Sequence, residues 1–213
     1  MEPGVPRVFP HSLGQRVDTT LLEVARTIQL KGLCTVERAA ESLLVPPSIV
    51  DELLTDYAVM FRITPRGVAL TATGRTWVSE QLVAERVGVN AAAVESCYGQ
   101  FLPLNERFKR LVSTWQVLSA TGHSKADWSD LLASVISLHA DFRPLVDATV
   151  GHLARLAPYG PRFDRALVNL QAGDASMLAS PLKDSYHTVW FEFHEELIAL
   201  SDRNRASEAC STG

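Results

Sequence analysis

Long hydrophobic runs are missing from this sequence: no stretch approaches the roughly 20 apolar residues that a bilayer-spanning helix needs. The first residues, Met1-Glu2-Pro3-Gly4, lack the basic and then apolar pattern of a signal peptide. These two absences predict a cytoplasmic protein.

Cysteine is also scarce, because the 213 residues contain only Cys34, Cys97 and Cys210. None of them forms a Cys-x-x-Cys pair or lies beside a histidine at metal-ligand spacing, which disfavours a disulfide framework and a zinc site. We therefore expect reduced, structural cysteines.

Motifs that carry nucleotide, acyl or metal chemistry are absent as well. The sequence has no glycine-rich phosphate loop, no Gly-x-Ser-x-Gly elbow, and neither His-x-x-x-His nor His-Glu-x-x-His. The sequence therefore does not predict a self-sufficient kinase or hydrolase, and it gives only weak support for a metal-binding site.

The charge balance is acidic, with 20 lysines and arginines against 24 aspartates and glutamates and a net charge of −4. Non-specific DNA affinity comes mainly from cations that neutralise phosphates, so this balance disfavours nucleic acid as a partner. Hydrophobic residues make up 46% of the chain, enough for an ordinary soluble globular protein with a buried core.

Periodicity predicts a mainly α fold, in which an N-terminal winged helix-turn-helix with a small β-hairpin wing precedes a C-terminal α-helical bundle. We expect a flexible arm over 1–17, a winged-helix domain over 18–80, a helical bundle over 81–205 and a disordered tail over 206–213. The bundle is the part expected to bind an acceptor substrate.

The N-terminal domain is predicted from three helices and a hairpin. Asp18, Thr35 and Ser48 are the expected N-caps of the helices, the third of which directs Ile49, Val50, Leu53 and Leu54 inward. Alternating residues then run over 59–64, turn at Pro65-Arg66-Gly67 and return over 68–71.

The wing exit Leu70-Thr71-Ala72-Thr73-Gly74-Arg75 resembles that of MarR-like winged-helix proteins. A DNA-reading helix-turn-helix needs basic or amide side chains on its second helix. Here that helix carries Asp51, Glu52 and Asp56 and no cation, which counts against DNA, although Arg62, Arg66 and Arg75 of the wing could touch a phosphate backbone.

The C-terminal half is predicted to form four or five helices. The first is expected to begin at Pro103 and to bury an apolar stripe, while a second stripe on it is solvated or lines a cavity, with solvent favoured. Further helices are expected over 128–142 and 143–156 and from Phe163 to Gly173, with His139 and His152 as packing residues. The first stripe is Leu104, Phe108, Leu111, Trp115 and Leu118, and the second is Asn105, Lys109, Val112 and Gln116.

The most informative segment is Asp184–Leu197, in which Asp184 is a candidate N-cap. His187, Phe191 and His194 share one face of the predicted helix. A histidine in the first turn feels the positive end of the helix dipole, which favours the neutral imidazole that an oxygen nucleophile needs as a base. The alternative is a filled core with satisfied hydrogen bonds.

Several segments together are similar to a winged-helix-plus-helical module found in actinobacteria with pyruvate phosphate dikinase-like (PEP-utilising type) phosphotransferases. The segments are Leu30-Lys31-Gly32-Leu33, the wing exit 70–75, Phe101–Lys109, Trp115-Gln116 and Asp184–Glu192. The resemblance implies a small subunit that binds an acceptor such as a phenol or hydroxyaryl ketone. ATP and Mg would lie on a large partner subunit with ATP-binding and phosphohistidine domains, and this chain would hold no cofactor and no metal.

The residue types in the segments that resemble this module suggest a role for each of several side chains. His187 would accept the phenolic proton, and Lys109 or Arg107 would steady the phosphoryl charge. Asn105 and Gln116 would orient a ring substituent. The acceptor ring would lie among the aromatic residues Trp115, Tyr186, Trp190 and Phe191, with His194 on the same helix face as His187.

Two other hypotheses about the function remain open. A MarR-like transcriptional regulator would dimerise through its helical half, bind DNA and hold an aromatic effector. A plain interaction module would bind no small molecule, and His187 would matter only for its stability.

Overall fold

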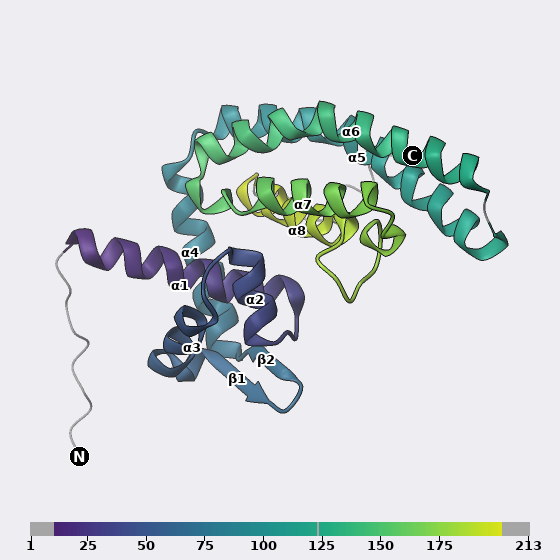
Figure 1. Cartoon of the computed structure of the whole chain (residues 1–213). Helices are drawn as coiled ribbons and strands as arrows, with labels where there is room; N and C mark the ends of the chain where they lie inside the picture. The colour runs from purple at the N-terminus through teal and green to yellow at the C-terminus, as the bar shows by residue number, and fades with distance from the viewer. Residues whose placement is uncertain (1–10, 123, 202–213) are drawn as a thin grey trace, which may run out of the picture. The chain divides into compact units, whose positions relative to one another are not determined.

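The computed structural model describes residues 11–122 and 124–201, and of residues 11–20 only the backbone (Figure 1). Within these ranges the chain is mainly helical, with one two-stranded antiparallel sheet. It divides between Gln81 and Leu82 into two compact units, here called the N-terminal unit and the helical unit. The expected boundary lay between residues 80 and 81. The expected tail over 206–213 and the first ten residues of the expected arm lie outside the described residues.

The N-terminal unit has the predicted order of three helices and a hairpin. The expected arm was too long, because α1 begins at His11 rather than at Asp18. The last proline of this region is Pro10, so the following residues lack the strongest helix breaker. The elements are α1 (His11–Lys31), α2 (Val36–Leu43), α3 (Pro47–Asp56), η1 (Ala58–Met60), β1 (Phe61–Thr64), β2 (Gly67–Leu70) and α4 (Ala72–Gly88), which crosses the boundary between the units.

The hairpin is short and tightly held. Its register pairs Phe61 with Leu70 and Thr64 with Gly67, and Cys34 adds an isolated bridge to Val68. Gly67 has φ +131°, and a Cβ there would lie 2.4 Å from the carbonyl oxygen of Cys34, so this position requires glycine. Cys34 is buried, as is Cys97 in the helical unit, which suits the structural role expected of these two cysteines.

The start of α3 differs from the prediction, whereas the start of α2 does not. Thr35 caps α2 by accepting a hydrogen bond from the backbone N–H of Arg38. Ser48 does not cap α3, because Pro46 occupies the N-cap position and Pro47 the first turn, where its fixed φ suits a helix. Ile49 was expected to point inward but is 37% exposed, while Val50, Leu53 and Leu54 are buried as expected.

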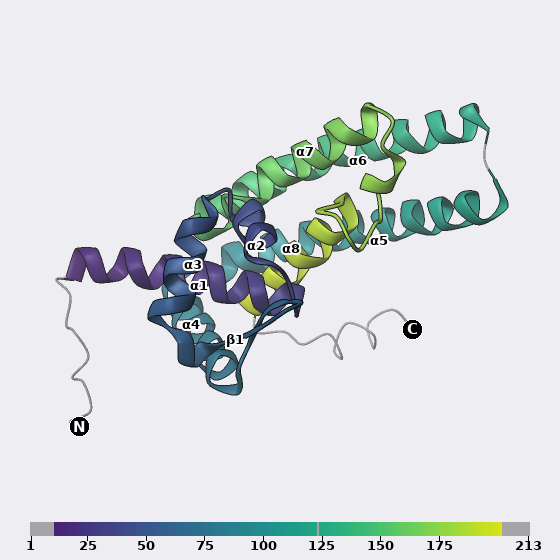
Figure 2. The ribbon, with the colours of Figure 1, turned by 60° about the horizontal axis from the view of Figure 1, so that its bottom comes forward.

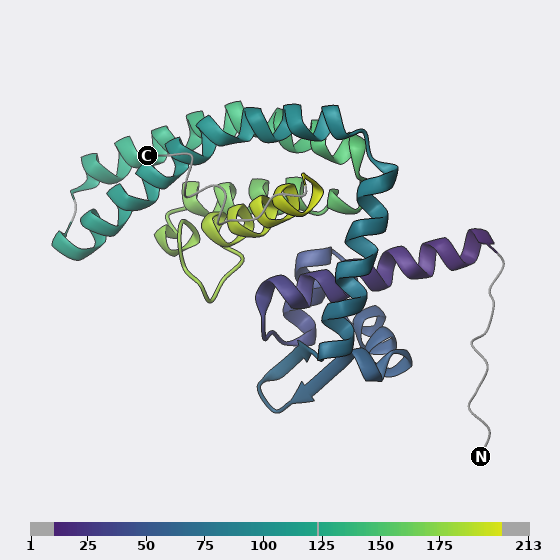
Figure 3. The same cartoon turned by 180° about the vertical axis from the view of Figure 1, so that it is seen from behind.

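The helical unit consists of two long helices and two shorter ones. Figures 1 and 3 show α5 and α6 side by side, and Figure 2 shows their connecting end running beyond α7 and α8. The elements are α5 (Ala91–Thr121), α6 (Lys125–His152), η2 (Ala154–Leu156), α7 (Tyr159–Gln171), η3 (Ala175–Met177) and α8 (Tyr186–Leu200). None of the helices in residues 11–122 and 124–201 is long and apolar enough to cross a bilayer.

Two predicted helix boundaries were wrong. Pro103 lies inside α5, which starts after Asn90, whose side chain accepts hydrogen bonds from the N–H groups of Ala92 and Ala93. No boundary falls between residues 142 and 143 either, because α6 continues through Pro144 to His152, and residues 154–156 of the expected second helix form η2. Buried residues continue at helical spacing on both sides of each proline, so tertiary packing outweighs the lost backbone hydrogen bond.

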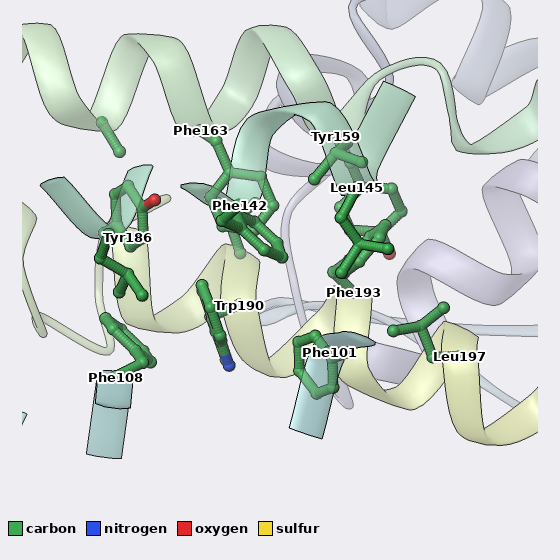
Figure 4. Close-up of a cluster of buried hydrophobic side chains, with 14 of the residues drawn as sticks. Phe101, Phe108, Phe142, Leu145, Tyr159, Phe163, Tyr186, Trp190, Phe193 and Leu197 are labelled. Carbon is green, nitrogen blue, oxygen red and sulfur yellow. The ribbon is translucent and has the colours of Figure 1, made fainter. Parts of the chain in front are cut away.

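An aromatic core joins the four helices of this unit (Figure 4). The Trp190 ring stacks on Phe108 with centroids 4.4 Å apart and lies 4.2 Å from Phe142. Phe163 of α7 meets Phe142 edge-on at 4.9 Å. Such pairs add to the area that each ring buries, so α8 is held as the central helix that its sequence predicts.

Buried ion pairs flank the aromatic core. Arg162 donates to both carboxylate oxygens of Asp184, at 2.8 and 2.6 Å, and also to Glu192 at 2.6 Å. Asp184 is therefore not the N-cap of α8, a role that Ser185 takes by accepting from the N–H of Thr188. Leaving the buried guanidinium of Arg162 without a carboxylate would cost more free energy than losing Asp184 as a helix cap, because Ser185 can cap α8 instead.

Candidate functional site

His187 is the second residue of α8 and lies at its surface. Its backbone N–H donates to the carbonyl of Leu178 at 2.9 Å, which fixes the first turn of the helix. The imidazole lies beside Phe108, with ring centroids 6.0 Å apart. Surrounding atoms partly desolvate the ring although the residue keeps contact with solvent, and this lowers the pKa of His187 below its ordinary value. The imidazole is therefore neutral and able to accept a proton near pH 7.

Tyr186 and Trp190 lie within the packed core. The hydroxyl of Tyr186 contacts Nδ1 of His139 at 3.1 Å, and Nε1 of Trp190 donates to Oδ1 of Asn105 at 2.9 Å. Asn105 is buried as well. These three predicted binding residues thus make their polar contacts inside the protein, which is the arrangement expected of the filled-core alternative.

The predicted face of α8 passes from solvent into the core. His187 is exposed, Phe191 is 38% exposed and His194 is 7% exposed. The His194 ring lies 4.8 Å from Phe101 by centroids. Only the N-terminal part of this face can therefore meet a ligand without rearrangement of the core.

The two predicted cations point to different sides of α5. Lys109 is exposed and pairs with Glu106 at 2.6 Å. Arg107 pairs with Asp141 of α6 and donates to Ser137 at 2.7 Å. Two residues along an α-helix are separated by about 200°, so Lys109 and Arg107 cannot both face one site.

The second stripe of α5 is divided between core and solvent. Asn105 and Val112 are buried, whereas Lys109 and Gln116 are exposed. The favoured expectation of a solvated stripe was therefore wrong for the two buried residues. Since Asn105 bonds to Trp190, its side of α5 packs against α8, and Lys109 and Gln116 lie along the same stripe.

Trp115 lies nearer the connecting end of α5 and α6 than Phe108 does. It is half-buried and meets Trp128 of α6 edge-on, with centroids 5.6 Å apart. Seven residues separate Trp115 from Phe108, which is roughly 10 Å along the helix axis. The predicted residues therefore form one group around His187 and Phe108 and another around Trp115.

His139 was predicted to be a packing residue because no carboxylate lies near it at helical spacing. The structure supplies one from another helix, with Nε2 of His139 lying 3.2 Å from Asp164 of α7. Burial lowers the pKa of His139, with Arg143 acting in the same direction and Asp164 opposing them. Burial also raises the pKa of Tyr186. No local signal connects Asp164 to His139, so only the fold reveals this chain of hydrogen bonds.

Phe108 was predicted as a core residue and proves also to be the ring beside His187. Among the described residues, no group of three or more histidine, cysteine, aspartate or glutamate side chains could hold a metal ion. No family model, curated protein or solved structure matches the chain.

Proposed function

We propose that the chain is a small, acceptor-binding subunit of a dikinase-type phosphotransferase that phosphorylates an aromatic hydroxyl group. The observation that carries the proposal is the neutral imidazole of His187, exposed at the start of α8 beside the Phe108 ring. A phenol on this surface would place its ring against the partly exposed Phe191 and its hydroxyl against the imidazole, while the buried Phe108 ring supports the imidazole from the core side.

The reaction step needs one base and one cation from this chain. The phenolic oxygen attacks phosphorus and its proton passes to His187, while the bond between phosphorus and the partner's phosphohistidine breaks and its electron pair returns to that imidazole. Lys109 would exchange Glu106 for the transferred phosphoryl oxygens. Arg107 supports this step less well, because Asp141 and Ser137 hold it on another side of α5.

Partner and acceptor follow from the same proposal. ATP and Mg would be bound by the large dikinase-like subunit, because the sequence has no nucleotide motif. Gln116 and Trp115 would meet a substituent of a longer acceptor, further along α5. The buried residues Asn105, Tyr186, Trp190 and His194 would act by holding α8 against α5 rather than by touching the ring.

The test is phosphoryl transfer in the presence of the dikinase-like subunit, Mg-ATP and a panel of phenols and hydroxyaryl ketones, followed by phosphorus NMR. Loss of a positioned base should lower turnover of His187→Gln by about 100-fold or more, with the far-ultraviolet spectrum unchanged. His152→Gln is the matched control, since His152 is also an exposed histidine of this unit. Equal turnover of the two variants would contradict the role given to His187.

A MarR-like winged-helix regulator is the second candidate function. Three helices followed by an antiparallel hairpin favour it, with Arg75 of the wing exit donating to the carbonyl of Leu70. The charges on α3 oppose it, because Asp51, Glu52 and Asp56 are exposed where DNA phosphates would dock. Specific binding to an operator, weakened by Arg62→Ala with Arg66→Ala, would favour this candidate over the first.

A further inference from the structure

The helices α5 and α8 lie side by side and run antiparallel. Phe108 contacts His187 at one level of this pair and Phe101 contacts His194 at another, with ring centroids 6.0 and 4.8 Å apart. Figure 4 shows the same order, with Phe108 beside the start of α8 and Phe101 further along it. These contacts establish which residues of the two helices lie at the same level.

Two exposed apolar side chains lie at nearly one level of the pair. Leu102 is 41% exposed on α5, and Phe191 is 38% exposed on α8. Leu102 follows Phe101, and Phe191 precedes His194 by three residues, so about 5 Å or less separates the two along the helix axes. Whether they meet depends on the side of each helix from which they project.

On α5, Leu102 lies on the side that faces away from α6. Successive residues of an α-helix are rotated by about 100°, which places Leu102 about 60° to one side of Asn105 and Trp115 about 80° to the other. Asn105 faces α8, where it bonds to Trp190. Trp115 faces α6, where it meets Trp128. Leu102 therefore projects next to α8, on the side opposite to α6.

On α8, Phe191 also lies on the side away from α6. The same rotation places Phe191 about 60° to one side of His194 and Phe193 about 100° to the other. His194 faces α5, where it contacts Phe101. Phe193 faces α6, where it meets Phe142 edge-on with centroids 5.6 Å apart. Phe191 therefore projects next to α5, on the side opposite to α6.

These two sides form one outer surface of the pair, because each lies between the two helices and opposite α6. Lys109 lies seven residues after Leu102, and His187 lies four residues before Phe191, spacings that keep side chains on one face of a helix. We call these four residues the α5–α8 surface. One end of it carries the base and the cation of the proposed reaction, and the apolar pair lies roughly 10 Å from Lys109 along α5.

We infer that Leu102 is a specificity-determining residue for the acceptor, and that the α5–α8 surface prefers phenols with an apolar substituent para to the hydroxyl group. The inference rests on the proposed function, from which it takes the position of the hydroxyl. With the hydroxyl at His187 and the ring against Phe191, the para position is directed toward Leu102. A substituent ortho to the hydroxyl would instead point toward Gln116.

The chemistry of Leu102 sets the direction of this preference. An apolar para substituent would remove its own surface and that of the leucine from water, which favours binding. A carboxylate at the same position would be partly desolvated against the leucine, which opposes binding. Phenols with an alkyl group should therefore bind more tightly than phenols with a charged group.

Binding without turnover is the first test, with dissociation constants of para-ethylphenol and para-hydroxybenzoate for the full chain measured by NMR titration. We expect para-ethylphenol to bind about tenfold more tightly, and Leu102→Ser to remove most of this preference. Leu102→Met keeps an apolar side chain and should retain it. Val117→Ser is the matched control, because Val117 is 60% exposed on the same helix but lies near the connecting end of α5 and α6.

Turnover in the presence of the dikinase-like subunit separates this contact from the chemical step. Leu102→Ser should raise KM for para-ethylphenol about fivefold and leave kcat unchanged, because Leu102 would meet the substituent and not the reacting atoms. A fall in kcat with KM unchanged would contradict the role given to Leu102.

Three results of the binding test would overturn the inference: equal affinity for the two ligands, no detectable binding of either, or equal effects of Leu102→Ser and Val117→Ser. Phosphorylation of both phenols with equal kcat/KM would overturn it while leaving the proposed function intact. A preference in binding that depends on Leu102, without phosphorylation of any phenol, would support the α5–α8 surface as a site for apolar phenols and contradict only the transfer reaction.

Discussion

The Asp164 carboxylate can only accept, so a neutral His139 carries its proton on Nε2, which lies 3.2 Å from Asp164. Nδ1 of that tautomer accepts a hydrogen bond from the Tyr186 hydroxyl, so the neutral imidazole satisfies both neighbours at once. A proton added to Nδ1 would face the Tyr186 hydroxyl and force it to find another acceptor inside the core. Burial and the nearby Arg143 guanidinium further disfavour the charged ring, against the attraction of Asp164. The pKa of His139 is therefore below the ordinary histidine value, which makes this residue a source of pH-dependent stability.

The sign of that dependence follows from proton uptake. As the pH falls through about 6.5, this histidine becomes protonated in the unfolded chain before it does so in the folded chain. The free energy of unfolding therefore decreases. Urea unfolding should therefore show lower stability at pH 5 than at pH 7.5. His139→Gln should reduce the difference between the two pH values, because glutamine can donate and accept but does not titrate.

His187 has a lowered pKa too and contributes with the same sign. The control is therefore His187→Gln, which should leave the part of the pH dependence due to His139 in place. If His139→Gln showed the full pH dependence of the unaltered chain, the neutral state assigned to His139 would be wrong. Resonances of the His139 ring, followed by NMR between pH 4 and 8, would locate its pKa directly.

At the scale of elements, the sequence predicts patterns of burial better than helix ends. The stripe containing Val189, Trp190 and Phe193 is buried and forms the expected central helix. The hairpin forms in the expected place, but β1 begins at Phe61 after η1, and burial over 59–64 does not alternate as predicted, because Met60 and Phe61 are both buried. Pro103 was predicted to start a helix because proline suits a first turn, and a boundary was expected between residues 142 and 143. Both positions lie inside helices, where packing of α5 and α6 on both sides of Pro103 and Pro144 outweighs the unfavourable effect of proline in a helix interior.

The candidate site was predictable only in part. His187 and Phe191 follow from helical spacing, because the side chains at i and i+4 share a face whatever the rest of the fold. The partner rings and carboxylates come from other helices, as Phe108 and Asp164 do, and no local pattern relates them to α8. Whether Tyr186 and Trp190 line a cavity or fill a core depends on this tertiary packing.

The start of α8 gives an element-scale prediction about the two adjacent residues Asp184 and Ser185. Asp184→Ala should destabilise the chain by about 3–5 kcal/mol, because it removes the bidentate partner of a buried guanidinium. Ser185→Ala removes an N-cap and should cost about 1–2 kcal/mol. Chemical unfolding at pH 7 would compare them, and a larger loss for Ser185→Ala would contradict the assignment of the cap.

At the scale of the whole molecule, the boundary at Gln81 and Leu82 falls inside α4. The last turns of α4 belong to the helical unit by their contacts. Glu85 accepts three hydrogen bonds from Arg155, which is 7% exposed and also bonds to Glu196 of α8. Arg86 donates to the carbonyl of Ala199 at 3.4 Å. The end of α4 therefore completes a buried ion cluster rather than serving as a spacer.

This assignment predicts how fragments of the chain fold. A fragment over 82–213 retains Glu85 and the aromatic core, so it should unfold cooperatively with high helix content. A fragment over 91–213 lacks Glu85 and leaves Arg155 with Glu196 alone, which should lower its stability by about 2 kcal/mol, the value of charge-assisted hydrogen bonds to a buried group. Glu85→Ala in the longer fragment should reproduce that loss, whereas Glu80→Ala in the full chain, on the other side of the boundary, should leave the unfolding of the helical unit unchanged. Equal stability of the two fragments would mean that the cluster around Arg155 does not depend on α4.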